Sequence, residues 1–439
     1  SEIEVVERYV KIVIQQHHST SLNRNVYFHL RLLLIEVMTL HPSEAICGTK
    51  SLSLKDKRIL LCITGSIAAV KCVELARELI RHGAEVTVIM SAAAAEIITP
   101  ESLEFATGKK VITKIEGAVE HVSLVEGPCK VDLILVAPAS ANTISKIANG
   151  IADNAVTLML ASALGARIPM ILVPSMHASL YDNPVIQENL KKLATLGIGI
   201  QILMPPLSEG AIKFLPIDEI VAFTIRRIGK NDLRDKNILV ITGSSEEAID
   251  DVRILTNRST GKTGIEIAKQ SFYRGANVEL WYGKVSEQIP KYIPSLHFTS
   301  ISDLAYKISY RLSTLDYIFV PAALSDYTVD SYPGKISSEL PEITLKLKKT
   351  PKIIKLLSEK GKVIPWKAES KIEVPELIER AHSKLMEING TLIIANLIED
   401  VTEDVSRIFI VYRDKNYEEL VGTREEIAER ILDVAVTTL

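Results

Sequence analysis

The stretch Lys57–Ser66 (KRILLCITGS) decides the fold of the first half of the chain. Its segment Ile59–Ile63 is apolar without a break, which is typical of a strand buried on both faces of a parallel sheet. The turn Thr64-Gly65-Ser66 follows, and a segment with helical periodicity then runs to about His82. A second apolar run, Val86–Met90, completes a predicted β-α-β unit.

The same arrangement recurs in the second half of the chain. Asn237–Ile241 is predicted as a strand that leads into Thr242-Gly243-Ser244, and Val278–Tyr282 is predicted as its partner. We therefore expect an α/β protein with two Rossmann-like three-layer α/β/α domains, joined by the polar linker Arg226–Lys236. Further apolar runs support a parallel sheet in each domain: Val131–Val136, Ile168–Val173, Tyr317–Val320 and Leu392–Ile394.

The first 50 residues differ from the rest. Three valines at helical spacing and a later amphipathic stretch, Tyr27–Met38, predict a short helical N-terminal extension over residues 1–50. The extension either serves in assembly or packs on the first domain. The two domains are then expected at residues 51–228 and 229–439.

Composition narrows the class of protein. A chain of 439 residues is too long for one ordinary core and favours two domains. The net charge of −3 gives no support for a nucleic-acid partner, and no apolar run reaches the roughly 18–20 residues that span a bilayer. The four cysteines form no CxxC pair, and the chain starts with acidic residues, unlike a signal peptide. We expect a cytoplasmic protein with no nucleic-acid or membrane partner.

Each Gly-Ser turn after a buried strand is a candidate phosphate site. Glycine permits close approach of the backbone, and a helix N-terminus offers free N–H groups and the positive end of its dipole. A single turn of this kind is equally compatible with a structural role. Neither turn has the GxGxxG or GxxxxGK[ST] pattern, which disfavours a NAD(P)-dependent oxidoreductase, the main alternative, and a P-loop NTPase.

Polar clusters follow three predicted strands of the first domain. They are residues 65–69 (GSIAA), 138–143 (PASANT) and 174–181 (PSMHASLY). In open α/β sheets, ligands bind at the carboxyl ends of the strands. The short hydroxyl and amide side chains of these clusters suit hydrogen bonds to a phosphate and a ring edge better than they suit metal ligation.

These motifs resemble the homo-oligomeric flavin-containing cysteine decarboxylases, a family that includes phosphopantothenoylcysteine decarboxylase. PASANT is present letter for letter, and His121 stands where that family has its active-site histidine. The resemblance implies a flavodoxin-like flavoprotein domain that binds FMN at a subunit boundary of a trimer. It implies catalytic roles for His121, Asn142 and His177, and FMN contacts from Gly65, Ser66, Ile67, Ser91, Pro138, Ala139, Ser140, Thr143 and Met176.

The resemblance also implies a reaction, the conversion of 4′-phosphopantothenoylcysteine to 4′-phosphopantetheine. FMN would oxidise the cysteinyl thiol to a thioaldehyde-like group, which acts as the electron sink for loss of CO₂. The enethiolate that results would then regain the hydride. Asn142 is implied to hold the substrate carboxylate, and His121 to position or deprotonate the reacting end.

Two departures from the family pattern leave an alternative open. In the PxMNxxMW motif the asparagine is His177, which can still donate a hydrogen bond to a carboxylate and resembles the archaeal branch, and Met-Trp is Leu180-Tyr181. The expected substrate-covering flap, residues 197–216, has no cysteine to protonate the enethiolate. Another acid, such as Glu209, or a different reduction step is then needed. A non-catalytic regulatory or assembly flavoprotein is the alternative for this domain.

Six phrases of the second half resemble phosphopantothenate–cysteine ligase, in the same order. They are residues 256–264 (TNRSTGKTG), 322–327 (AALSDY), 334–336 (GKI), 349–353 (KTPKI), 366–370 (WKAES) and 395–396 (AN). The resemblance implies that a nucleotide, usually CTP with Mg²⁺, activates the carboxylate of 4′-phosphopantothenate. The amine of L-cysteine then attacks the acyl-nucleotide. Charge develops on phosphates and on an oxyanion, so cations and amide donors are needed. The choice between CTP and ATP stays open.

The ligase resemblance assigns roles residue by residue. Asn257 is implied to hold the acyl carbonyl and Lys335 to bind the nucleotide phosphates. Ile388 stands where a second lysine is expected, so one charge contact is missing, and no residue is assigned to the metal. A trimer of first domains combined with a dimer of second domains implies a homo-oligomer such as a dodecamer. The further implied nucleotide contacts are Gly243, Asp326, Thr350, Pro351, Lys352, Ile353, Trp366 and Lys384.

Overall fold

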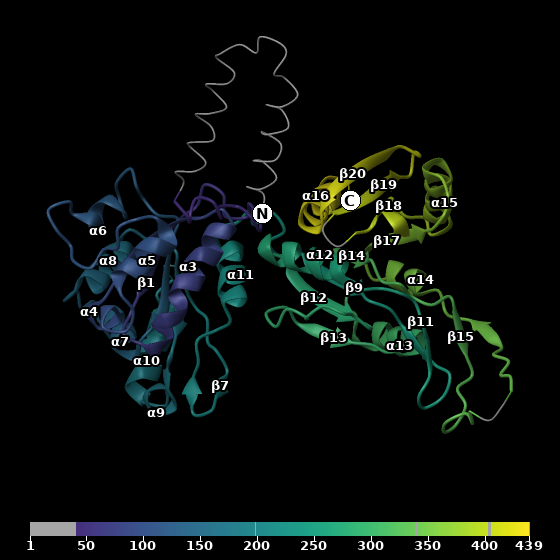
Figure 1. Cartoon of the computed structure of the whole chain (residues 1–439), viewed down its shortest axis with the longest axis horizontal. Helices are drawn as coiled ribbons and strands as arrows, with labels where there is room; N and C mark the ends of the chain where they lie inside the picture. Colours follow the sequence, from purple (N-terminus) through teal and green to yellow (C-terminus); the bar gives the residue numbers. More distant parts are fainter. Residues whose placement is uncertain (1–40, 198, 339–340, 403–404, 439) are drawn as a thin grey trace, which may run out of the picture.

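The computed structural model describes residues 41–197, 199–338, 341–402 and 405–438. Most of the predicted extension, residues 1–40, lies outside the described residues. The chain forms two α/β halves that lie side by side, with the first half on the left of Figure 1 and the second on the right. No helix in the described ranges is long and apolar enough to cross a membrane.

The first half is built on a five-stranded parallel sheet in the order β2-β1-β3-β4-β6. This is the flavodoxin-like order, in which the direction of winding reverses between β1 and β3. The strands are β1 (Arg58–Ile63), β2 (Glu85–Met90), β3 (Leu133–Ala139), β4 (Met170–Pro174) and β6 (Ile200–Ile202).

Helices cover both faces of this sheet because successive strand residues point to opposite faces. Ile59, Leu61 and Ile63 pack under α3, α5 and α11, whereas Leu60 and Cys62 pack under α7, α8 and α10. The helical elements are η1 (Ile67–Lys71), α3 (Cys72–Arg81), α4 (Ala92–Ala95), α5 (Pro100–Thr107), α6 (Glu120–Ser123), α7 (Ala141–Ala148), α8 (Ala155–Gly165), α9 (Ala178–Tyr181), α10 (Pro184–Thr195) and α11 (Ile217–Ile228).

A small antiparallel sheet occupies the predicted flap. Its order is β5-β8-β7, formed by β5 (Met176–His177), β7 (Leu207–Ser208) and β8 (Ala211–Ile212). Glu209 and Gly210 connect β7 to β8 with φ values of 50° and 71°, as a tight two-residue hairpin turn requires. His177 lies opposite Ala211, so the flap is hydrogen-bonded to the strand that carries His177.

The second half contains an eight-stranded sheet in the order β13-β12-β9-β14-β17-β18-β19-β20. Its first six strands are parallel, β19 pairs antiparallel with both β18 and β20, and the winding reverses between β9 and β14. The strands are β9 (Asn237–Thr242), β12 (Asn277–Tyr282), β13 (Ser295–His297), β14 (Tyr317–Val320), β17 (Lys362–Glu369), β18 (Leu392–Leu397), β19 (Val405–Tyr412) and β20 (Tyr417–Thr423).

Helices again cover both faces, so the expected three-layer α/β/α architecture is confirmed in each half. Helices α12 (Lys262–Tyr273) and α16 (Arg424–Thr438) pack on one face of the second sheet. The other face packs against α13 (Ile301–Arg311), α14 (Ile353–Ser358) and α15 (Val374–Glu387), and a short η2 (Ile398–Asp400) follows β18.

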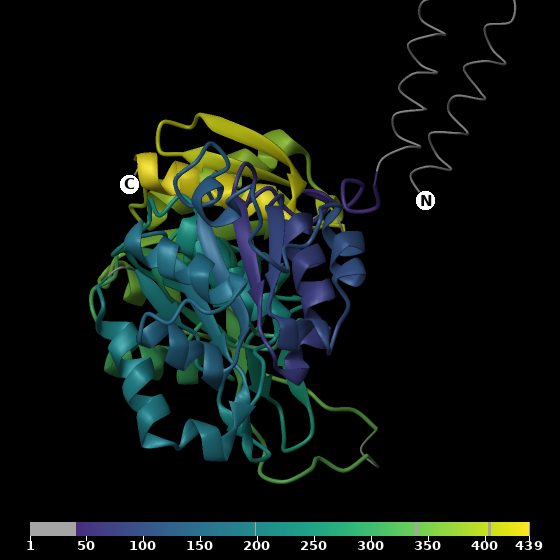
Figure 2. The same cartoon turned by 90° about the vertical axis from the view of Figure 1, so that its left-hand side faces the viewer.

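Two hairpins rise from this second sheet. They are β10 (Glu246–Ala248) with β11 (Ile254–Thr256), and β15 (Tyr327–Val329) with β16 (Leu347–Lys349). The described residues between β15 and β16, 330–338 and 341–346, extend away from the body of the second half, as Figures 1 and 2 show. We call residues 327–338 and 341–349 the arm.

The halves meet where α11 packs beside α12. Arg226 of α11 donates hydrogen bonds to the carbonyls of Phe272 (2.7 Å), Gly275 (2.9 Å) and Ala276 (2.7 Å) at the end of α12. The prediction that the polar linker begins at Arg226 was therefore wrong, since α11 continues to Ile228. The polar residue Arg226 was taken as a sign of a solvent-exposed linker, but its guanidinium group donates hydrogen bonds to carbonyl groups of the other half.

A second contact between the halves holds a protonatable carboxyl group. Glu425 of α16 accepts a hydrogen bond from the hydroxyl of Ser53 at 3.4 Å. Burial, and then the neighbouring carboxylate of Glu266, raise the pKa of Glu425 from its ordinary 4.5 to about 7. The junction therefore favours a neutral carboxyl group at this position.

We expect stability to fall as pH rises across this range. The folded pKa of Glu425 lies above its unfolded value, so its stabilising effect is complete below about pH 4.5 and is lost as pH rises through 7. Glu425→Gln should remove a dependence of about 2–3 kcal/mol between pH 5 and 8, measured by denaturant unfolding. Glu379→Gln, at an exposed carboxylate, is the control. Equal pH slopes for wild type and Glu425→Gln would contradict this.

Candidate functional site

Three serines line the carboxyl edge of the first sheet. Ser66, Ser91 and Ser140 follow β1, β2 and β3, and each caps the helix that begins there. Their side-chain oxygens accept hydrogen bonds from backbone N–H groups of the first helical turn. Because β2, β1 and β3 are neighbours, the hydroxyls and helix N-termini gather at the switch point of the sheet.

The buried hydroxyl of Thr64 ties two of these loops together. It donates to the carbonyl of Pro138 at 2.6 Å and accepts from the backbone N–H of Ser140 at 2.9 Å. Ser66 donates to the hydroxyl of Ser175 at 3.3 Å, which joins the loop after β4 to the same edge. Neither Thr64 nor Ser175 was predicted as a site residue from the sequence. The available signal was a polar residue directly after an apolar strand.

The residues of this edge fit a flavin nucleotide. The loop after β1 passes close to α4, since a Cβ on Gly65 would lie 2.6 Å from that of Ala93. Ile67 beside it is 77% exposed and offers an apolar surface to a planar ring, while Met176 of β5 is buried. Uncharged hydroxyls and helix N-termini match a phosphate. Pro138, Ala139 and Thr143 complete the PASANT loop at this edge, with Thr143 Oγ1 3.1 Å from Ser140 Oγ.

The three predicted catalytic residues of the first half lie on different elements. Half-buried His121 sits on α6, and its Nδ1 is enclosed without a hydrogen-bond partner. Asn142 lies exposed in the first turn of α7, and His177 lies exposed at the end of β5. No hydrogen bond within the described residues links any two of the three.

Glu209 does not suit the role of the missing acid. It forms an ion pair with Lys213 in the flap, and hydrogen bonding to that lysine lowers the pKa of the Glu209 carboxyl. The group is therefore a carboxylate near neutral pH and has no proton to give.

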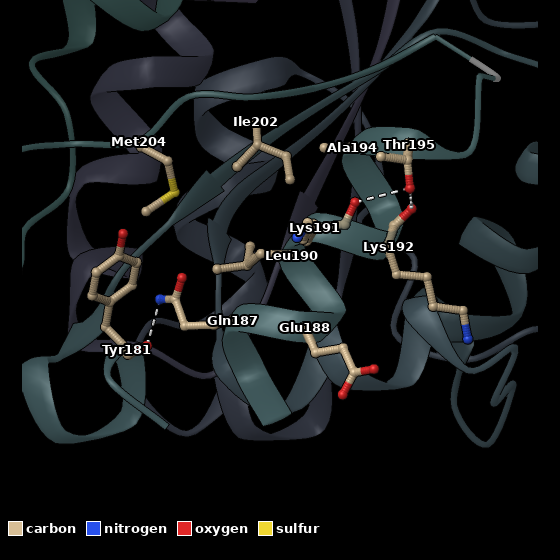
Figure 3. A pocket seen from close by; sticks show the side chains of 10 residues that line it. All are labelled: Tyr181, Gln187, Glu188, Leu190, Lys191, Lys192, Ala194, Thr195, Ile202 and Met204. Atoms are coloured by element: carbon tan, nitrogen blue, oxygen red, sulfur yellow. Dashed lines mark hydrogen bonds between the residues drawn. The ribbon is translucent and has the colours of Figure 1, made fainter. Parts of the chain in front are cut away.

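An open groove of about 1080 Å³ lies beside α10 and β6 (Figure 3). Tyr181 and Met204 stand at one end of it, and Leu190 and Ile202 form its apolar floor. None of the residues predicted to bind FMN or substrate lines it, so it is not assigned to either site.

The second site lies where β9 and β14 end. Gly243 adopts a φ of 78°, and a Cβ there would lie 2.6 Å from the carbonyl oxygen of Lys284. The carbonyl of Gly243 accepts from the N–H of Ala323 at 2.8 Å, and Asn257 donates to the carbonyl of Ala323 at 3.1 Å. Asn257 is thus held at the switch point of the second sheet.

Asp326 and Lys352 lie together at this edge. Their charged atoms are 3.4 Å apart and both side chains are exposed. Thr350 joins the segments, since its N–H donates to the carbonyl of Asp326 at 3.0 Å. Lys384 of α15 pairs with Glu387 at 2.9 Å, and Lys384, followed by Lys352, lowers the pKa of Glu387. Four charged groups from three segments therefore gather here.

Other predicted nucleotide contacts are placed differently. Pro351 is exposed, whereas the side chain of Ile353 is buried in the core. Trp366 packs toward α12 and α16, on the face of the sheet opposite the one that α15 covers. The sheet therefore separates the Trp366 ring from Lys384. Lys335 is exposed on the arm.

Comparison with known proteins identifies the family. The family model described as "Flavoprotein" matches residues 48–229, and that described as "DNA/pantothenate metabolism flavoprotein C-terminal domain" matches residues 233–438. The coenzyme A biosynthesis bifunctional protein CoaBC of Thermococcus kodakarensis is 40% identical over 402 residues, which cover 90% of this chain and 98% of that protein. CoaBC of Methanocaldococcus jannaschii is 37% identical over 407 residues, covering 91% and 98%.

The chain belongs to the CoaBC family. This confirms the expected function, a bifunctional coenzyme A biosynthesis enzyme with a flavoprotein decarboxylase half followed by a ligase half. The archaeal resemblance is confirmed too, since both relatives come from archaea. A solved structure, the DNA/pantothenate metabolism flavoprotein from Streptococcus pneumoniae, is 28% identical and covers 45% of this chain and 97% of its own, with a TM-score of 0.42.

Thr64 allows a test of the CoaBC flavin edge. Thr64→Val keeps the shape but leaves the carbonyl of Pro138 and the N–H of Ser140 unpaired, at a cost of about 1–3 kcal/mol. The variant should purify with less flavin per chain, measured by absorbance. Thr64→Ser keeps the hydroxyl and should retain it. Full flavin content in Thr64→Val would show that the hydrogen bonds of the Thr64 hydroxyl do not shape the flavin site.

Proposed function

We propose that the second half joins L-cysteine to 4′-phosphopantothenate and that the first half decarboxylates the product to 4′-phosphopantetheine. We assign the two reactions to residues 229–439 and 51–228. The observation that carries the proposal is the pair of separate switch-point sites, each built from the motif residues of one activity. The two sites share no described residue, so each reaction can be abolished alone.

In the first half, the proposed roles follow from position and chemistry. FMN, when bound, supplies two-electron oxidation and reduction at the cysteinyl thiol. Ser66 and Ser140 hold its phosphate with hydroxyl and backbone donors. The Asn142 amide donates to the substrate carboxylate, and His121 takes the thiol proton or positions it. His177 supports the carboxylate beside the flap, whose hairpin shields the reacting end from water.

In the second half, we propose CTP as the nucleotide, with Mg²⁺ bound through the triphosphate. Within the described ranges no group of three or more His, Cys, Asp or Glu is placed to hold a metal. Mg²⁺ commonly binds through substrate phosphates and one or two carboxylates. Lys335, Lys352 and Lys384 offset phosphate charge, and Asn257 donates to the acyl carbonyl as the amine attacks. Pyrophosphate release with CTP compared against ATP tests the nucleotide.

We further propose a cytoplasmic homo-oligomer that has trimers of first halves and dimers of second halves, together a dodecamer. Solution mass tests this assembly. A non-catalytic regulatory first half is the second candidate, because the flap has no cysteine and Glu209 is ion-paired. Wild-type protein that binds flavin and releases pyrophosphate, but no CO₂, would favour that candidate.

Asn142→Ala should abolish decarboxylation alone. Removing a donor to the substrate carboxylate should lower CO₂ release on the order of 100-fold, while pyrophosphate release stays at the wild-type rate. Asn149→Ala, at the other end of α7, is the matched control. Loss of both activities in Asn142→Ala would argue against two separate sites.

Lys335→Met should impair ligation alone and leave decarboxylation intact. It removes a cation from the developing phosphate charge, so pyrophosphate release should fall on the order of 100-fold. CO₂ release from supplied 4′-phosphopantothenoylcysteine should be unchanged. Lys348→Met, at an exposed lysine of the same arm, should leave both rates intact. A fully active Lys335→Met ligase would remove Lys335 from the proposed site.

A further inference from the structure

Two buried carboxylates lie in the β10–β11 hairpin, beneath the arm. Glu247 accepts hydrogen bonds from the N–H of Ile301 at 2.9 Å and from the hydroxyl of Thr328, at the base of the arm, at 2.8 Å. Asp250 lies at the tip of the hairpin. Both residues are only 3% exposed. Carboxylates are rarely buried to this extent unless hydrogen bonds or ion pairs compensate for the loss of water, so the partners of both groups matter.

Asp250 is hydrogen-bonded at both oxygens. Oδ1 accepts from the N–H groups of Val252 (2.8 Å) and Arg253 (2.6 Å), and Oδ2 accepts from the guanidinium of Arg253 (2.5 Å) and the N–H of Ile336 (3.1 Å). Burial raises the pKa of Asp250, but these hydrogen bonds prevail and hold it at about 2. Asp250 is therefore an anion near neutral pH.

These contacts hold the backbone on both sides of Lys335. The N–H of Asp251 donates to the carbonyl of Gly334 at 3.3 Å, and Arg253 donates to the carbonyl of Ile336 at 3.2 Å. The residues before and after Lys335 are thus bound to the hairpin, while the lysine side chain itself is exposed. Such an arrangement fixes the backbone position of a flexible lysine and leaves its ammonium group available to a ligand.

The same hairpin also fixes Asn257. Strand β11 ends at Thr256, whose hydroxyl donates to the carbonyl of Ser245 at 2.7 Å, and Asn257 follows directly. One short hairpin therefore leads into the proposed amide donor and anchors the segment of the proposed phosphate-binding lysine. The distance between these two groups depends on the hairpin tip.

We propose that Asp250 is a positioning residue of the ligase reaction, which holds Lys335 through Ile336 and Arg253 so that its ammonium group meets the nucleotide phosphates. The proposal rests on the proposed role of Lys335. A displacement of about 1 Å at a reacting group can cost on the order of 100-fold in rate. Loss of the anchor should therefore reduce ligation strongly, although Asp250 touches no substrate.

A double-mutant cycle distinguishes positioning from simple structural support. Asp250→Asn, which removes the charge and one acceptor, should lower kcat for pyrophosphate release on the order of 100-fold in the wild-type background. In Lys335→Met the same change should have an effect of less than about 2-fold, because there is no lysine left to position. CO₂ release from supplied 4′-phosphopantothenoylcysteine should be normal in both variants, which reports an intact first half, and the small effect of Asp250→Asn in the Lys335→Met background reports an intact second half.

The controls separate the two ways of failing. Asp330→Asn removes an exposed carboxylate that pairs with Lys348 on the same arm and should not change kcat. Two outcomes would overturn the positioning role and leave the proposed ligase site intact, provided that Lys335→Met lowers kcat. In the first, Asp250→Asn lowers kcat by the same factor with and without Lys335. In the second, Asp250→Asn leaves kcat unchanged. Active Lys335→Met would instead overturn the proposed site. If Asp250→Asn is poorly soluble, Arg253→Gln, which removes the bond to Ile336, should show the same dependence on Lys335.

Discussion

Both halves depend on parallel strands that are buried on two faces. Leu60 and Leu61 of β1 are fully enclosed although they point to opposite sides of the sheet, and the same holds for Val240 and Ile241 of β9. Side chains in such strands are committed to packing and cannot take part in chemistry. Chemistry is therefore left to the loops, and in open α/β sheets ligands bind at the carboxyl edge, whose loops must also satisfy their own backbone hydrogen bonds. The position of each site follows from that constraint.

The loops at the two carboxyl edges satisfy their backbone hydrogen bonds in different ways. In the first half, hydroxyl side chains form hydrogen bonds with the backbone of the loops. The clearest case is Thr64, which bonds to Pro138 and Ser140. Neutral donors of this kind, together with helix N-termini, suit a flavin phosphate. The nucleoside triphosphate that we propose for the second half carries more charge and extends farther, so its proposed site uses lysines from separate segments. The arm carries Lys335, the segment after it carries Lys352 and α15 carries Lys384, while the buried anion of Asp250 connects the hairpin to the arm.

Much of this was predictable. The apolar runs placed the strands, and the Thr-Gly-Ser turns and the PASANT loop placed the edge of the first sheet, because local periodicity and turn chemistry decide these features. The polar segment at Arg226 was misjudged because its guanidinium binds carbonyl groups more than 40 residues away in sequence. Likewise, the motif at Trp366 did not reveal that its ring faces away from α15. A strand alternates its faces, and only the sheet decides which helix covers each.

The sequence by itself determined the family, the α/β class, the order of the two halves and the segments that carry chemistry. Tertiary structure alone decided that Thr64 joins two loops, that Glu209 is held as an ion pair in the flap, and that Asp250 lies under the backbone next to Lys335. These are contacts between groups whose separation along the chain ranges from 4 to 86 residues. A buried carboxylate and a solvated one have the same letter in a sequence, and only the folded chain shows which N–H groups surround it.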